Sequence, residues 1–404
     1  MNMTCRVALA VLVPIAAGCA RMVGRSAEMA EPPCCRAAGL RIAERHGVKA
    51  IDARRFTHAT LWEALAPHLG AGGLRVADVG RSSEGRAIRA VTFGTGATRV
   101  LLWSQMHGDE SSATMALADL IAWFAAPSVE DDALRRRLAS ELTIVMVPML
   151  NPDGAERFQR RNAMNVDVNR DALDLVTPEA RALEALRDSL RPDFGFNLHD
   201  QNANTLAGRG GPQAAISLLA PATDASRSWN AVRSRARLLA ADIAAVVARE
   251  LPGRVARYDD TFEPRAFGDV MQQRGTSTVL IETGALPGDP EKQRLRAINV
   301  VAILTALDAI ATRRLGRANP RFYEALPGNV RGGTSAPCAD RAWGSVADTH
   351  RPRCARCANG SARSATCRPS SRWCGRPATR SPSARWGCGS CARCCPSPRC
   401  SSAS

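Results

Sequence analysis

The chain has 404 residues, of which 45% are hydrophobic, so it is long and apolar enough for one large or two ordinary globular domains. Its formal charge is +16, but 13 Arg against two acids give residues 331–404 a net +11, which leaves the first 330 residues only mildly basic. None of the 14 cysteines lies between residues 36 and 337, and this excludes a disulfide framework and thiol chemistry for the central part.

The N-terminus has the order of a secretory signal. Arg6 precedes an apolar run over residues 7–17, which is too short to span a bilayer as a helix, and small residues precede Cys19. We therefore expect residues 1–19 to be a signal or lipoprotein signal peptide, with export to the bacterial periplasm or cell envelope. A lipid on Cys19 would attach the protein to a membrane. The alternative is an apolar N-terminal helix of a cytosolic protein. Residues 20–37 are predicted to be a tether.

The middle of the chain alternates between strand and helix patterns. In chain order, the first half predicts a helix over 59–69, strands over 74–79, 86–93 and 98–104, a helix over 111–124, a strand over 142–148 and a loop opening at Asn151. The second half predicts a helix over 178–190, a strand ending at 199, a strand over 216–220, a helix over 229–250, a strand over 276–281 and a helix over 291–314. This alternation predicts one α/β domain over residues 38–330, a three-layer α/β/α structure with a mixed, mostly parallel sheet.

Residues 331–404 are rich in Arg, Cys, Ser and Pro and show neither strand alternation nor a helical apolar face. We expect a disordered tail. A zinc ribbon is one alternative, but 30 residues separate Cys357 from Cys388, against about 15 to 20 in the usual ribbon. Binding of nucleic acid or another anion is a second, but lysines and interleaved aromatic residues are missing, so no nucleic-acid partner is expected. The composition is typical of GC-rich DNA translated out of frame, which favours a frameshift product.

Four side chains at predicted strand ends carry the chemistry. His107 and Glu110 follow one apolar strand, and His199 follows another; two imidazoles and a carboxylate are the set that a catalytic zinc ion uses. Glu282 ends a third strand, where it could accept a proton from water. Each residue also has an ordinary structural explanation. His107 and Glu110 could belong to a surface turn, His199 could be a hydrogen-bonded core histidine, and Glu282 could be an ion-pair partner. The small number of histidines favours a metal site, because no other histidine ends an apolar strand. The remaining histidines are His46, His58, His68 and His350.

With these residues in place, the sequence resembles the zinc metallocarboxypeptidases related to carboxypeptidase A. The resemblance runs from about residue 74 to 315 and includes five blocks in the family's order: HGDE at 107, NPDG at 151, RRNAMNVDVNRD at 160, NLHDQ at 197 and VLIETG at 279. It implies one Zn²⁺ ion on His107, Glu110 and His199, with Glu282 as the general base.

The resemblance also implies substrate contacts. Asn169 and Arg170 would hold the terminal carboxylate, and Arg161 would polarise the scissile carbonyl, with the adjacent Arg160 as the alternative. Asp167 would accept the other ring N–H of the first histidine. Tyr258 lies near the place of the family's mobile substrate-capping tyrosine, although it could equally be structural. Candidates for the side-chain pocket are Arg265, Phe267 and Asp269.

The expected function is that of a zinc-dependent exopeptidase, which hydrolyses C-terminal peptide bonds with a water molecule activated by zinc and Glu282. One alternative keeps the zinc site and changes the substrate to peptidoglycan stem peptides or N-acyl amino acids. Another is an inactive binding protein whose basic tail holds an anion. Serine-hydrolase and HExxH metalloprotease chemistry lose support because neither GxSxG nor HExxH occurs.

Overall fold

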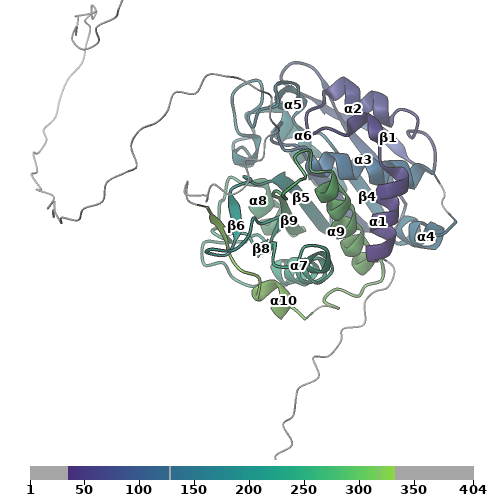
Figure 1. Ribbon diagram of the computed structural model, residues 1–404. Coiled ribbons are helices and arrows are strands. Elements are labelled where there is room, and N and C mark those ends of the chain that lie inside the picture. The colour runs from purple at the N-terminus through teal and green to yellow at the C-terminus, as the bar shows by residue number, and fades with distance from the viewer. Residues whose placement is uncertain (1–34, 127–128, 318, 333–404) are drawn as a thin grey trace, which may run out of the picture. The chain divides into compact units, whose positions relative to one another are not determined.

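An eight-stranded mixed sheet lies at the centre of the computed structural model, which describes residues 35–126, 129–317 and 319–332 (Figure 1). The strand order is β1-β2-β4-β3-β5-β9-β7-β8. The strands are β1 (Arg75–Arg81), β2 (Ala87–Phe93), β3 (Thr98–Ser104), β4 (Leu142–Val147), β5 (Phe194–Asp200), β7 (Ile216–Leu219), β8 (Val255–Arg257) and β9 (Ser277–Thr283). β3 pairs in parallel with β4 and β5, as do β5 with β9 and β7 with β8. The remaining pairs are antiparallel.

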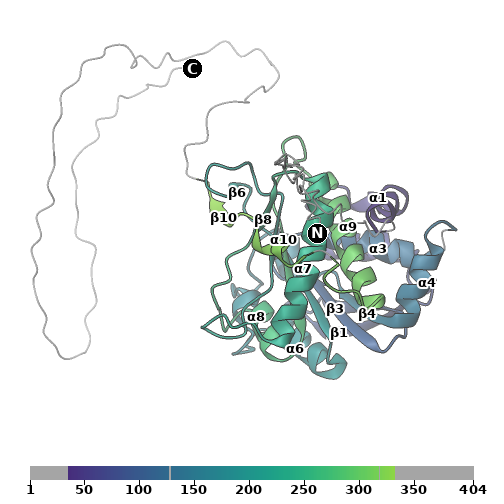
Figure 2. The same cartoon turned by 90° about the horizontal axis from the view of Figure 1, so that it is seen from below.

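Helices cover both faces of this sheet. Along β3, Val100 and Leu102 face a large core, whereas Leu101 and Trp103 face a smaller one, as the two-residue period of a strand requires. The large core includes residues of α1 (Cys35–His46), α2 (His58–Leu65), α3 (Ser112–Ala125), α4 (Asp132–Glu141), α7 (Ala231–Glu250) and α9 (Gln293–Ala311). The smaller one includes residues of α6 (Pro178–Leu190) and α8 (Phe267–Gln273). In Figure 2, α6 and α8 lie on the side of the sheet opposite α1 and α3. The predicted α/β class and mixed, mostly parallel sheet are confirmed.

Short elements complete the described chain. They are the 3-10 turns η1 (Lys49–Ile51) and η2 (Val168–Arg170), the helices α5 (Pro152–Arg157) and α10 (Arg321–Glu324), and the paired strands β6 (Thr205–Ala207) and β10 (Asn329–Arg331). Within the described segments, no helix combines the length and apolar character needed to cross a membrane.

Three expectations need correction. α1 begins at Cys35, which is buried with Ala38 and Ile42 on one helical face, so residues 35–37 are helix and not tether. Asn151 caps a helix instead of opening a loop, because its side chain accepts a hydrogen bond from the Gly154 N–H at 2.8 Å at the start of α5. Arg331, the expected first residue of the tail, pairs with Thr205 in the β10–β6 ladder.

Two groups of expectations lie outside the described residues: the signal peptide and Cys19, and residues 333–404 with their zinc-ribbon, anion-binding and frameshift alternatives. The structure therefore bears only on the α/β domain and its immediate boundaries.

A buried ion pair joins the segment before β1 to the two large helices of the core. Arg296 of α9 donates through Nε to Asp119 Oδ2 of α3 at 2.7 Å, and its Nη atoms donate to the carbonyls of Ile51 at 3.0 Å and Val48 at 3.1 Å. Both side chains are nearly fully buried, so neither charge can be solvated if the other is removed.

We predict that Arg296→Met lowers the free energy of unfolding by about 3–5 kcal/mol, because it leaves Asp119 buried without its cationic partner. Chemical denaturation of the full chain measures the change. Arg294→Met, at an exposed position of the same helix, is the matched control, and equal stability of the two variants would contradict the prediction.

Candidate active site and metal centre

The candidate site lies where the parallel strands end at their carboxyl edge, which is where open α/β sheets bind ligands. His107 and Glu110 are in the turn between β3 and α3, and His199 and Glu282 stand opposite each other in the β5–β9 ladder. The turn packs against α5 so closely that a Cβ on Gly108 would lie 1.9 Å from the Gly154 carbonyl carbon. Glycine is therefore required between the two ligand candidates.

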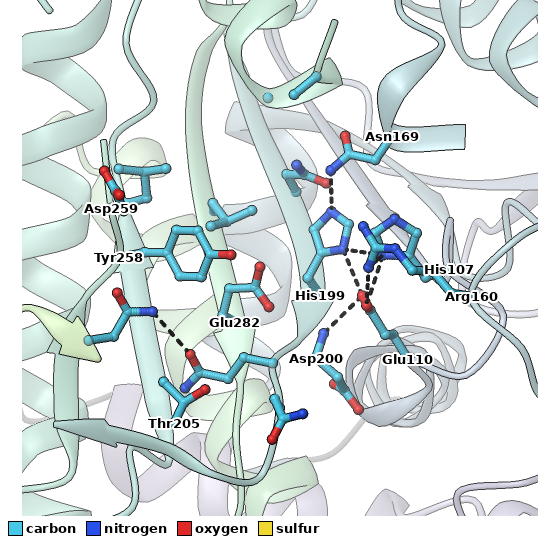
Figure 3. A pocket seen from close by; sticks show the side chains of 18 of the residues that line it. His107, Glu110, Arg160, Asn169, His199, Asp200, Thr205, Tyr258, Asp259 and Glu282 are labelled. Atoms are coloured by element: carbon cyan, nitrogen blue, oxygen red, sulfur yellow. Dashed lines mark hydrogen bonds and ion pairs between the residues drawn. The ribbon is translucent and has the colours of Figure 1, made fainter. Parts of the chain in front are cut away.

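His107, Glu110 and His199 converge on one point (Figure 3). All three are buried, and their candidate ligand atoms lie within 4.8 Å of one another. Glu110 Oε1 is 2.8 Å from His107 Nδ1, and Glu110 Oε2 is 2.7 Å from His199 Nδ1. Two imidazole nitrogens and a carboxylate facing one another fit a zinc ion that has a further position open.

Burial and neighbouring charges shift the pKa values of this cluster in opposite directions. Burial alone would lower the pKa of His107, but the Glu110 charge and the contact with Asp167 raise it to about 9. Burial dominates at His199 and lowers its pKa. Burial would also raise the pKa of Glu110, yet the two imidazoles hold it well below its ordinary range. Glu110 is thus a carboxylate held between two rings, which is the charge state that a metal ligand needs.

Asp167 and Asp200 hold the ligand candidates from behind. Asp167 Oδ1 lies 3.0 Å from His107 Nε2, so the ring nitrogen that faces away from Glu110 has a carboxylate partner. This arrangement orients a metal-binding histidine and raises its basicity. Asp200 donates its backbone N–H to Glu110 Oε2 at 3.1 Å.

Arg160, and not Arg161, faces the cluster. Arg160 Nη1 lies 3.2 Å from Glu110 Oε1, and its Nε donates to Asp167 Oδ2 at 3.0 Å. Arg161 is exposed and folds back over its own turn, where it donates to the Asn165 carbonyl at 2.8 Å. Of the two adjacent arginines, Arg160 is thus the one beside the ligand candidates, since neighbouring side chains in this loop point in different directions.

A cleft of about 920 Å³ opens in front of these residues and contains most of the predicted substrate contacts. Asn169, Arg170, Tyr258 and Glu282 line it. Asn169 Nδ2 lies 3.5 Å from His199 Nε2, and its Oδ1 accepts a hydrogen bond from the Phe267 N–H at 3.1 Å. These bonds leave its side chain fixed beside the cluster.

Glu282 and Tyr258 face each other across this cleft (Figure 3). Burial, reinforced by the Glu110 charge, raises the pKa of Glu282 to about 8. The Glu282 charge, together with burial, raises the pKa of Tyr258 to about 12. Glu282 can therefore exchange a proton near neutral pH, whereas Tyr258 stays a neutral hydroxyl.

Of the three side-chain pocket candidates, the structure brings only Asp269 to the cleft, where burial raises its pKa to about 7. Phe267 is buried in the smaller core, and Arg265 is exposed and paired with Glu263.

Sequence reasoning missed further residues that line the cleft, among them Arg54, Asp109, Asp200 and Lys292. One feature of the sequence could have drawn attention to Lys292, since only one other lysine, Lys49, occurs in the chain. No sequence feature indicated Arg54, because it lies more than 50 residues before the HGDE block.

Comparison with known proteins finds similarity to carboxypeptidases. Residues 72–231 match the family model described as zinc carboxypeptidase. Carboxypeptidase 2 of Trichophyton rubrum is 30% identical over 110 residues, 27% of this chain and 20% of that protein. Carboxypeptidase SOL1 of Arabidopsis thaliana is 31% identical over 104 residues, 23% of this chain and 21% of that protein. The aligned part thus spans about a fifth of these relatives' length.

Solved structures resemble the chain at low sequence identity. Thrombin activatable fibrinolysis inhibitor has a TM-score of 0.51 and 10% identity, covering 68% of this chain and 80% of that chain. A metallo-carboxypeptidase from Burkholderia cenocepacia has a TM-score of 0.49 and 19% identity, covering 63% and 70% of the two chains. At these identities the likeness of the first structure shows the fold alone.

We predict that the purified full chain binds about one Zn²⁺ ion and that His199→Ala loses it, because two protein ligands cannot hold a catalytic zinc ion tightly. Metal analysis after dialysis measures the stoichiometry. His58→Ala is the control, since that ring contacts the Ala87 carbonyl and does not line the cleft. Retention of stoichiometric zinc by His199→Ala would show that the metal is held elsewhere.

Proposed function

Because residues 72–231 match the zinc carboxypeptidase family model, we propose that this chain is a metallocarboxypeptidase that hydrolyses the C-terminal peptide bond of its substrate. The observation that carries the proposal is the convergence of His107, Glu110 and His199 beside the buried carboxyl of Glu282, in a cleft that also contains arginines. A peptide with a free terminal carboxylate offers an anion for the arginines and a scissile carbonyl for the metal centre.

The three ligands would hold the zinc ion, which when bound polarises a carbonyl and makes a water molecule more acidic. Glu282 then acts as the base that takes a proton from water and as the acid that returns it to the departing amine. The raised pKa of Glu282 suits both roles, because such a carboxyl accepts a proton readily and releases it again near neutral pH. A bound cation would move this pKa below its metal-free value of about 8.

Arginines supply the remaining charges. Arg160 lies against Glu110 and is the guanidinium beside the ligand cluster, where it would stabilise negative charge developing on the carbonyl oxygen. Arg170 lines the cleft, with Nη1 bonded to the Asn169 carbonyl at 2.9 Å and Nε 3.6 Å from Glu263. A planar guanidinium held in this way suits a terminal carboxylate, and Asn169 can add a hydrogen bond. Tyr258 can donate its hydroxyl to the same substrate.

Three substrate classes can present a free carboxylate to this cleft: ordinary peptides, peptidoglycan stem peptides and N-acyl amino acids. Kinetics on one member of each class separates them, and amidation of the terminal carboxylate should abolish turnover of the preferred one. Rapid cleavage of the amidated peptide would contradict an exopeptidase, and binding without hydrolysis of any class would favour an inactive binding protein.

We predict that Glu282→Gln lowers kcat by about 10²- to 10⁴-fold, the usual contribution of a positioned acid or base, while zinc content is retained. In the native chain kcat/KM should rise with pH through the pKa of Glu282, because only the carboxylate accepts the proton. The midpoint should lie below 8, owing to the bound cation. Rates of zinc-loaded protein across the pH range test both statements. Glu63→Gln, at an exposed position, is the control. Full activity of Glu282→Gln would show that Glu282 is not the base.

We further predict different effects at two adjacent arginines. Arg160→Met should lower kcat by about 10²- to 10³-fold, as expected for loss of a group that stabilises the developing oxyanion. Arg161→Met should leave kcat within about threefold, because the Arg161 guanidinium bonds to the Asn165 carbonyl of its own turn and is not among the residues that line the cleft. Steady-state kinetics on the two variants decides between them, and the reverse ranking would restore the role to Arg161.

A further inference from the structure

Lys292 is a buried lysine in the wall of the active-site cleft. It is 5% exposed, and it precedes α9 in a left-handed conformation with φ of 53°. A residue other than glycine in this conformation is strained, and an ammonium loses hydration when it is buried. Two unfavourable features at one residue require a compensating set of contacts.

Those contacts join the ends of two strands. Lys292 Nζ donates to Asp200 Oδ2 at 2.9 Å and to the Thr283 carbonyl at 3.2 Å. Asp200 is the last residue of β5 and Thr283 the last of β9, and the two are paired in the parallel ladder. The preceding pair in the same ladder is His199 and Glu282. The ammonium is thus anchored one residue beyond a ligand candidate and the proposed base.

Asp200 extends the connection to the third ligand. Its backbone N–H donates to Glu110 Oε2, and its Oδ2 also accepts the hydroxyl of Ser112 at 2.8 Å, at the start of α3. Arg54 is the other cation near this carboxylate, but its Nη2 is 3.8 Å from Oδ2, beyond hydrogen-bond distance. Lys292 is therefore the nearer of these two cations, and it also binds β9.

We propose that Lys292 is a positioning residue, whose ammonium fixes the placement of His199 and Glu110 relative to Glu282. It does not itself contact the reacting atoms. The inference rests on the proposed zinc-dependent hydrolysis at this site. A displacement of about 1 Å in such an arrangement can cost about 10²-fold in rate, and loss of a group behind a metal ligand commonly costs 10- to 100-fold in metal affinity or activity.

The test compares the full-length wild type with Lys292→Met, which keeps the length of the side chain and removes its charge. We expect kcat per zinc-loaded molecule to fall by about 10- to 100-fold, with KM within about threefold, and zinc release to a chelator to become about tenfold faster. Lys49→Met is the matched control, because Lys49 is the other lysine of the chain and is exposed in η1. It should behave as wild type in every measurement.

A second variant separates positioning from stability. Lys292→Met leaves Asp200 as a buried charge without its nearest cation, so the double variant Lys292→Met/Asp200→Asn should recover thermal stability but not kcat. If Lys292→Met does not fold, the double variant alone is compared with wild type. A purely structural role predicts that kcat per folded, zinc-loaded molecule stays within about threefold of wild type, and that result would overturn the proposal.

Failure of the proposed peptidase activity would give other results than failure of the positioning role. A wild-type chain that binds zinc but cleaves none of the substrate classes would contradict the peptidase activity, while the rate of zinc release would still decide whether Lys292 positions the ligands. In an active enzyme, kcat per zinc-loaded molecule within about threefold of wild type would reject the positioning role, whatever the rate of zinc release. A wild type without zinc at His107, Glu110 and His199 would overturn both.

Discussion

The parallel pairing of β5 with β9 is the constraint on which the site depends. It sets His199 directly beside Glu282, so a ligand candidate and a base candidate more than 80 residues apart in the chain become neighbours. β3 pairs with the other edge of β5, and the turn after β3 brings His107 and Glu110 to the same end of the sheet. A slip of one residue in either ladder would turn these side chains to the other face.

Buried charges then determine how those neighbours behave. Glu110 lies between two imidazoles and stays ionised, whereas the pKa of Glu282 is raised by burial and, to a smaller extent, by the negative charge of Glu110. Two glutamates of the same chemical type thus acquire different properties: one is suited to bind a cation and the other to exchange a proton. Asp167 and Asp200 support the cluster from the protein side through hydrogen bonds to His107 and Glu110.

The cleft combines residues that short motifs identify with residues that they do not. His107, Glu110, His199 and Glu282 each end or follow an apolar strand, so periodicity alone predicts that they reach one edge of a parallel sheet. The choice between Arg160 and Arg161 could not be made in this way, because the loop has no period. The choice depends on the hydrogen-bond partners: Arg160 bonds to Asp167, whereas Arg161 bonds to the Asn165 carbonyl.

The sequence by itself determined the α/β class, the order of the main elements and the set of candidate ligands, because apolar periodicity and motif spacing are local properties of the chain. It also placed the cysteines at the two ends of the chain and most of the excess charge in residues 331–404. Only the tertiary structure decided which arginine faces the cleft and that Lys292 joins β5 to β9. These features depend on contacts between segments distant in sequence, such as Lys292 with Asp200, and no local pattern encodes such distances.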